Sequence, residues 1–179
     1  ITEGYVVPAA VNGGYRKELH SLLTTQGYAV DYVGTLKYPD AVLEGWVDGD
    51  HEGRRGYKID EIRSEAALWL KRVPNPDVIL LHIGTNDFWA GGDVETAQDQ
   101  LRSLLAELST LRPHARIILS SLNPRTDSFE TIQDQFNDSL PGIVSEQVTL
   151  GRKVTFVDMH DGFGTAPADF SVDGVHPSS

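Results

Sequence analysis

Apolar residues along the chain follow two alternating patterns, one with helical spacing and one of short continuous runs. Helical spacing is clearest at Val94, Ala97, Leu101, Leu104, Leu105, Leu108 and Leu111. Such spacing predicts an amphipathic helix with one buried face. The same spacing predicts two earlier helices. One is capped by Asn12 and has its apolar face at Tyr15, Leu19, Leu22 and Leu23. The other is capped by Asp60 and has its apolar face at Ile62, Ala66, Trp69 and Leu70. The first should end at Gly27, and a fourth helix, over 129–148, should break near Pro141.

Short apolar runs predict four strands, at 29–34, 78–83, 116–121 and 154–158. The continuous runs 78–83 and 116–121 are typical of strands buried on both faces of a parallel sheet. A polar, Gly-rich loop is expected over 35–58. Alternating strands and helices predict an α/β domain with a parallel sheet. Ligands of such sheets bind at the carboxyl ends of the strands, so the segments after Gly34, Ile83, Ser121 and Asp158 should line one face.

Composition narrows the possible partners. The chain has 179 residues, which suits one domain, and a net charge of −11. Such a charge disfavours nucleic acid or an anionic membrane as partner and suits a neutral substrate such as a sugar polymer. The absence of cysteine from the sequence excludes disulfides, thiolate metal sites and a cysteine nucleophile. No apolar run reaches the roughly 20 residues that span a bilayer.

The first candidate for chemistry is Gly84-Thr85-Asn86-Asp87, directly after the apolar run 78–83. Gly84 allows a sharp turn, after which the Asn86 amide would present N–H groups at the edge of the sheet. An amide donor there can stabilise a developing oxyanion, and one such donor is worth roughly 100- to 1000-fold in rate. The alternative is an ordinary turn in which Asn and Asp bond their own backbone.

The second candidate is Asp173-Gly174-Val175-His176-Pro177. A carboxylate three residues before a histidine can accept from one ring nitrogen and fix the tautomer, which leaves the other nitrogen as a general base. Histidine suits that task because its side chain titrates near neutrality. The alternative is a surface turn rich in Gly and Pro.

The third candidate is the segment 50–57, at the end of the long loop. A glycine there can bring a backbone N–H close to a ligand; the alternative is a flexible loop. The order of the three segments resembles that of the GDSL/SGNH hydrolases, whose four motifs supply a serine, a glycine, an asparagine and a histidine. The resemblance implies a catalytic base at His176, an orienting carboxylate at Asp173, and an oxyanion hole from the Gly56 N–H and Asn86. Gly56 is preferred to Gly53 because it lies nearer the following helix.

The first residues, Ile1-Thr2-Glu3-Gly4-Tyr5, resemble the continuation of the family's Gly-Asp-Ser-(Ile/Leu)-Thr-x-Gly motif. The nucleophilic serine is therefore expected immediately before Ile1, outside the given sequence. The chain also stops just after the histidine motif, where the family has a final helix. We expect residues 1–179 to be one esterase domain trimmed at both ends, and this exact chain to be inactive without its nucleophile.

Three further segments, 13–16, 31–35 and 51–57, resemble carbohydrate esterase family 3, whose members remove acetyl groups from xylan. The resemblance implies a flavodoxin-like, three-layer α/β/α sandwich with about five parallel strands. It also implies a secreted, monomeric serine esterase that needs no cofactor and acts on acetylated polysaccharide or small acetyl esters. Trp46 or Tyr57 could stack on a sugar. The alternatives are a lipid or thioester hydrolase of the same superfamily and a non-catalytic carbohydrate-binding relative without the serine.

Two other acidic segments raise the question of a metal. The segment 48–53 begins like a calcium loop, but its twelfth position would be Ile59 rather than Glu, so the EF-hand interpretation fails and only some other cation remains possible there. Asp158, His160 and Asp161 have no standard zinc spacing. The expected site therefore contains no metal.

Overall fold

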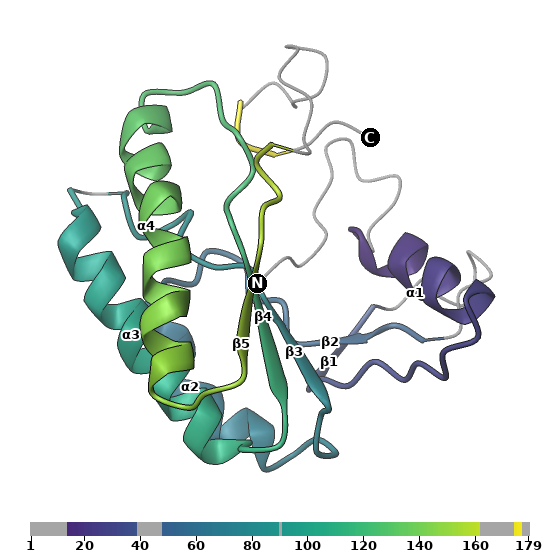
Figure 1. Ribbon diagram of the computed structural model, residues 1–179. Coiled ribbons are helices and arrows are strands. Elements are labelled where there is room, and N and C mark those ends of the chain that lie inside the picture. The colour runs from purple at the N-terminus through teal and green to yellow at the C-terminus, as the bar shows by residue number, and fades with distance from the viewer. Residues whose placement is uncertain (1–13, 39–47, 90, 162–173, 177–179) are drawn as a thin grey trace.

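The structure is a computed structural model that describes residues 14–38, 48–89, 91–161 and 174–176. Its α/β class agrees with the sequence prediction. In chain order the elements are α1 (Arg16–Thr25), β1 (Leu36–Lys37), β2 (Asp50–His51), α2 (Ile59–Leu70), β3 (Val78–Leu81), α3 (Val94–Leu111), β4 (Arg116–Ser120), α4 (Glu130–Thr149) and β5 (Val154–Val157) (Figure 1). Asn12 and Asp173 lie outside the described residues.

The central element is a three-stranded parallel sheet in the order β3-β4-β5. Leu81 pairs with Leu119, and Leu119 pairs with Phe156, so one register aligns the carboxyl ends of all three strands. These strands were predicted from the apolar runs, and the structure ends β3 two residues earlier than the run does. A separate antiparallel pair, β1 and β2, lies within the predicted long loop.

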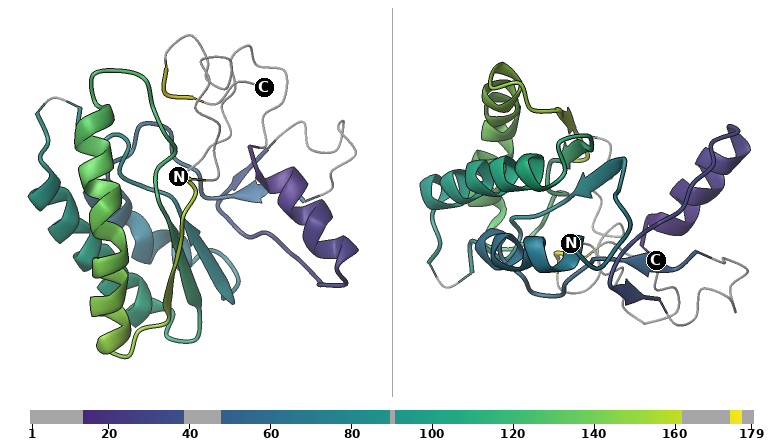
Figure 2. Two further views of the ribbon diagram at one scale, coloured as in Figure 1. Left: turned by 45° about the horizontal axis from the view of Figure 1, so that its top comes forward. Right: turned by 90° about the horizontal axis from the view of Figure 1, so that it is seen from below.

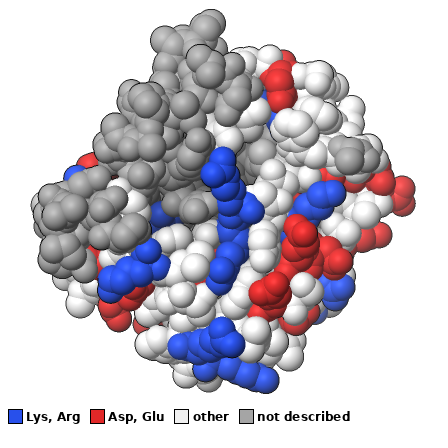
Figure 3. Space-filling model, turned by 180° about the vertical axis from the view of Figure 1, so that it is seen from behind, with Lys and Arg blue, Asp and Glu red and all other residues white. Residues whose placement is uncertain are grey.

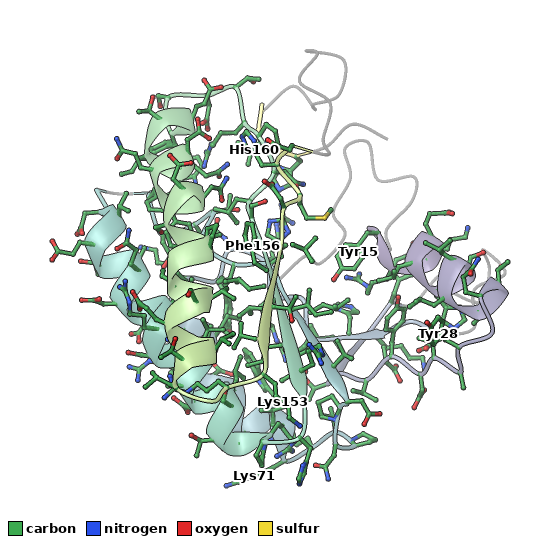
Figure 4. All side chains as sticks on the ribbon, viewed as in Figure 1. Tyr15, Tyr28, Lys71, Lys153, Phe156 and His160 are labelled. Atoms are coloured by element: carbon green, nitrogen blue, oxygen red, sulfur yellow. The ribbon has the colours of Figure 1, made fainter. Side chains whose placement is uncertain are left out.

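Helices α2, α3 and α4 cover one face of this sheet, whereas α1 lies beyond β3, away from α4 (Figures 1 and 2). The hydrophobic core lies between these three helices and the sheet and contains Leu101, Leu105, Leu119 and Phe136. Phe156 points from β5 toward α4 and packs against this core (Figure 4). Helix α3 confirms its prediction, because it spans Val94–Leu111 and buries most of the predicted apolar face. Its cap, Asp93, was not predicted and accepts from Thr96 N at 2.8 Å.

The other face of the sheet is not buried as the continuous apolar runs predicted. Val78, Leu80 and Val157 are 47%, 37% and 39% exposed. The topology explains this difference: β3, β4 and β5 follow one another in a single direction, and successive right-handed crossovers in one direction place their helices on the same face. The described residues therefore form one helical layer on the sheet, where the sequence led us to expect two.

Three local predictions were wrong. Residues 29–34 form no strand; the Tyr32 N–H donates to Asp48 Oδ2 at 2.6 Å instead of joining a strand ladder. The expected apolar face of α1 is not buried, since Tyr15 and Leu22 are exposed. Asp60 does not cap α2, because the helix begins at Ile59, and the Lys58 N–H donates to Glu61 Oε2 at 2.7 Å.

Helix α4 is also continuous through Pro141, where we expected a break. Pro141 faces solvent, while Phe136, Leu140, Ile143 and Val144 bury the opposite face of the helix in the core. Burial of four large side chains contributes several kcal/mol, which exceeds the roughly 3 kcal/mol that proline costs inside a helix.

Among the described helices, none is long and apolar enough to span a membrane. Charged side chains of both signs share the face seen from behind, where a strip of Lys and Arg runs beside a group of Asp and Glu (Figure 3). The net charge of −11 is therefore not spread evenly over the surface.

Candidate active site

The turn after β3 joins two of the predicted site segments. Gly84 adopts φ 129°, a conformation that favours glycine, and a Cβ at this position would press against the Phe136 ring. The chain then turns, with Asp87 N–H donating to Gly84 O at 3.0 Å. This turn directs the Asn86 side chain to the segment before α2, where Nδ2 donates to Tyr57 O at 3.1 Å. Asn86 therefore lies beside the residue that follows Gly56.

Asp87 strengthens the same junction. Its carboxylate oxygens lie 3.1 and 3.3 Å from the Ile59 N–H, the first backbone amide of α2. Burial, only partly offset by this hydrogen bond, raises the pKa of Asp87 to about 6. A cavity of about 140 Å³ lies behind this contact and is lined by Lys58, Asp87, Gly92, Asp93, Thr96, Ala97 and Gln100. Asn86 and Asp87 together fix residues 57–59 against the turn.

Gly56 has φ 75°, and a Cβ built on it would meet no atom within 4 Å. Glycine is favoured here for its backbone conformation and not for lack of space. Next to it, Arg54 lies over the Trp69 ring at 4.6 Å and also bonds Thr35 Oγ1 at 2.6 Å. These contacts fix the loop on the N-terminal side of Gly56.

The segment that carries His176 is anchored to the loop after β4. Thr126 N–H donates to Gly174 O at 2.8 Å, two residues before His176. The segment 174–176 lies beyond the carboxyl end of the sheet (Figure 1). The structure therefore brings Gly56 and Asn86 together and attaches His176 to the loop that follows the neighbouring strand. Asp173, its predicted partner, is outside the described residues.

Ser121, a buried serine at this edge of the sheet, has a structural role. Its hydroxyl donates to Asp158 Oδ1 at 3.0 Å and accepts from the backbone N–H groups of Met159 and His160 at 2.7 and 3.0 Å. Ser121 is 1% exposed, so these bonds tie the end of β4 to the end of β5 away from solvent. His160 lies beyond β5, 3.4 Å from Asp134 Oδ1 on α4 (Figure 4).

In the two acidic segments where a metal ion was considered, the acidic side chains contact other groups of the protein. Asp48 accepts from Tyr32 N, Asp50 lies 3.2 Å from Lys37 Nζ, and Glu52 Oε2 accepts from Thr35 N at 2.7 Å. These three carboxylates therefore have different partners. Within the described part of the chain, no group of three His, Cys, Asp or Glu side chains is placed to hold a metal ion.

Sequence reasoning missed three residues near this edge. Trp89 ends the turn that contains Asn86, and its ring lies 5.1 Å from that of Phe129, just before α4. Arg125 is 1% exposed and lies against Phe129. The position of Trp89 two residues after the Gly84–Asp87 motif was a usable signal. A buried arginine gives no such signal, because arginines are mostly exposed.

An amide donor, a left-handed glycine and a histidine segment near the carboxyl ends of a parallel α/β sheet form the arrangement that the sequence predicted for a hydrolase. The chain matches the GDSL-like lipase/acylhydrolase family over residues 1–179, and it belongs to that family. The family is one of esterases and acylhydrolases, as the sequence motifs suggested.

Solved structures of family 3 carbohydrate esterases are similar to this chain. One from Clostridium thermocellum is 33% identical with a TM-score of 0.81, and the match covers 94% of this chain and 79% of that one. Another, from Talaromyces cellulolyticus, is 25% identical with a TM-score of 0.78, covering 92% and 81%. The resemblance to this carbohydrate esterase family is therefore confirmed.

Two curated relatives are longer proteins. Endoglucanase X of Acetivibrio thermocellus is 32% identical over 120 residues, 67% of this chain and 50% of its own length. A multidomain esterase of Ruminococcus flavefaciens is 26% identical over 197 residues, 95% of this chain and 25% of its own length. The chain thus spans half or less of these curated relatives.

Proposed function

We propose that the protein is a serine esterase that removes O-acetyl groups from a polysaccharide such as xylan. The observation that carries the proposal is the contact of Asn86 Nδ2 with Tyr57 O, which holds an amide donor beside Gly56. Family membership supports ester hydrolysis. A similar fold, at a TM-score of 0.66 and 22% identity, belongs to an acetyl-xylooligosaccharide esterase from Geobacillus, which agrees with an acetylated sugar as substrate.

The proposed mechanism is acyl transfer to a serine at the position before Ile1. His176 removes the serine proton while Asp173 orients its ring, and the serine oxygen attacks the acetyl carbonyl. The serine N–H, the Gly56 N–H and Asn86 Nδ2 stabilise the tetrahedral oxyanion. The sugar hydroxyl leaves with the proton from His176. Water, deprotonated by His176, then hydrolyses the acetyl-enzyme to acetate.

The proposal extends to the domain and its setting. It places β3, β4 and β5 in a flavodoxin-like, three-layer sandwich of about five parallel strands, with a second helical layer on the face that carries Val78, Leu80 and Val157. The domain is proposed to act as a secreted monomer on neutral substrates without a cofactor. Its negative charge supports the exclusion of nucleic acid and anionic membranes.

Acetate release from acetylated xylan by the full-length protein tests the proposal. His176→Ala should abolish acetate release. His160→Ala is a matched control, because His160 also lies at this edge but has no part in the mechanism, and it should keep most of the activity. The proposal fails if His176→Ala retains full activity, if only long-chain or thioesters are hydrolysed, or if the codon before that of Ile1 does not encode serine.

A further inference from the structure

Trp89 is an exposed aromatic residue whose ring contacts a second aromatic ring. It is 48% exposed, and its ring lies 5.1 Å from the Phe129 ring at an interplanar angle of 34°. The two residues come from different loops, Trp89 from the turn after β3 and Phe129 from the end of the loop after β4. Burying such a ring would be favourable, so its exposure at the catalytic edge suggests a ligand that covers it.

Phe129 is itself held from behind. The Arg125 guanidinium carbon lies 5.2 Å from the centre of the Phe129 ring. Asp127 binds Arg125 through both carboxylate oxygens, to Nε and NH2, each at 2.6 Å. The same carboxylate accepts from Phe129 N at 3.0 Å. Arg125 is buried, so the Arg125–Asp127 ion pair supports the ring of Phe129, against which Trp89 packs.

Trp89 and Phe129 belong to the two loops that carry or anchor the proposed catalytic segments. Trp89 is three residues after Asn86 in the same turn. On the other side, Arg125 precedes Thr126, whose N–H holds Gly174, two residues before His176. A polymer that is bound at Asn86 and His176 and extends along these two loops would therefore reach the Trp89–Phe129 pair.

We propose that the Trp89–Phe129 pair is a binding subsite for a pyranose ring of a neutral polysaccharide, adjacent to the sugar that carries the ester. This inference rests on the proposed function and names a residue that sets its specificity. One face of a pyranose presents C–H groups that pack on an aromatic ring, while the hydroxyls at its rim remain in water. An open platform, with one face covered and the other in solvent, provides that arrangement. An acyl chain would instead need a site that encloses it.

The experiment combines binding and kinetics in the full-length protein. Tryptophan emission and calorimetry follow the titration of unacetylated xylohexaose, which requires no chemistry. Steady-state kinetics compare acetylated xylooligosaccharide with 4-nitrophenyl acetate. Trp89→Ala should weaken xylohexaose binding and raise KM for the oligosaccharide about tenfold, since this is the typical scale of one stacked ring. KM and kcat for 4-nitrophenyl acetate should change less than about twofold.

Two further variants separate binding from folding. Trp89→Phe keeps an aromatic face and should recover most of the oligosaccharide affinity. Leu150→Ala removes an apolar side chain that is 66% exposed at the opposite end of α4, and it should leave both substrates unaffected. The proposal is overturned if Trp89→Ala binds xylohexaose as tightly as the parent, if it impairs both substrates equally, or if it impairs long-chain esters selectively.

The two proposals fail separately. A parent protein that binds xylohexaose through Trp89 but releases no acetate refutes the esterase function and retains the subsite. A parent that releases acetate from sugars but shows no Trp89-dependent binding or KM effect retains the function and refutes the subsite. A parent that does not bind xylohexaose also refutes the subsite.

Discussion

Asn86 and Tyr57, 29 residues apart in sequence, are joined by a hydrogen bond from Asn86 Nδ2 to the Tyr57 carbonyl oxygen at 3.1 Å. A side-chain amide has two N–H groups, so this bond orients the amide and leaves a second N–H for an oxyanion. Gly56, the other proposed donor, precedes Tyr57 directly. The two donors therefore belong to one locally rigid unit.

Replacing Asn86 with Ala should lower kcat of the full-length protein on 4-nitrophenyl acetate by about 100- to 1000-fold, because one oxyanion donor is lost. KM should change less than about threefold, since the donor acts mainly in the transition state. Steady-state kinetics measure both values.

Asn137→Ala is the matched control for this variant. Asn137 also bonds backbone groups, the N–H and C=O of Leu122, at 2.8 and 3.0 Å. Its loss should reduce the free energy of unfolding by about 1–3 kcal/mol and leave kcat within a few-fold of the parent. A kcat for Asn86→Ala close to that of Asn137→Ala would refute the role of Asn86.

Asp87 should make stability depend on pH. Burial raises its pKa from 3.8 to about 6 in the folded protein. Between these values the folded state binds more protons at Asp87 than the unfolded state, so the contribution of Asp87 to stability falls as pH rises from 4 to 6 and then levels off. Asp87→Asn cannot ionise and keeps an acceptor for Ile59 N. The free energy of unfolding of Asp87→Asn minus that of the parent should therefore rise by about 2–3 kcal/mol as pH increases from 4 to 7.

Urea unfolding at several pH values tests this prediction. Asp138→Asn, at an exposed position on α4, should differ from the parent in free energy of unfolding by the same amount at every pH. Asp87→Ala should be less stable than Asp87→Asn by about 1–3 kcal/mol, because the Ile59 N–H loses its acceptor. A difference for Asp87→Asn that does not change with pH would contradict the argument.

The local pattern of apolar residues correctly predicted those elements whose formation depends mainly on residues close in sequence. The helix over Val94–Leu111 was predicted from its regular apolar stripe, and the helix in the structure runs from the first to the last residue of that stripe. The strand over 29–34 and the break at Pro141 failed because they depend on partners distant in sequence. A short apolar run becomes a strand only where a neighbouring strand accepts its hydrogen bonds, and neighbours cannot be derived from periodicity.

In the candidate site, too, sequence motifs predicted one part of the arrangement and could not predict another. Motif order grouped Asn86 with Gly56, and in the structure Asn86 Nδ2 donates to the carbonyl oxygen of Tyr57, the residue after Gly56. The roles of Gly56, Asn86, Asp173 and His176 stay predictions. The stack of Arg125, Phe129 and Trp89 could not be predicted, because it joins loops after two different strands and depends on side-chain packing.

His51 should destabilise the protein in mild acid. Burial and the nearby Arg16 lower its pKa to about 4, despite the opposing effect of Glu52. Its Nδ1 accepts from the Gly53 N–H at 3.1 Å, so the ring is neutral in the fold. As pH falls from 6.5 to 4, the unfolded state takes up a proton on this histidine that the folded state does not, and the contribution of His51 to stability falls by about 3 kcal/mol, opposite in sign to that of Asp87.

Chemical denaturation of His51→Asn at several pH values measures this effect. The variant lacks the titrating ring, so its free energy of unfolding minus that of the parent should rise as pH falls from 6.5 to 4; the Asp87 effect is present in both proteins and cancels in this difference. His114→Asn, at an exposed position, should follow the parent. Parallel curves for His51→Asn and the parent would contradict the prediction.

Gly92 and Gly142 should respond in opposite directions to replacement by Ala. A Cβ at Gly92 would overlap the backbone carbonyl oxygen of Asp87, so the turn that carries Asn86 must shift. Gly92→Ala should therefore cost about 1–3 kcal/mol of stability and also reduce kcat. Gly142 lies inside α4 with nothing within 4 Å of its would-be Cβ, and Gly142→Ala should stabilise by up to about 1 kcal/mol. Urea unfolding and kinetics on 4-nitrophenyl acetate distinguish the two, and a Gly92→Ala variant as stable and active as the parent would show that the turn does not need this close approach.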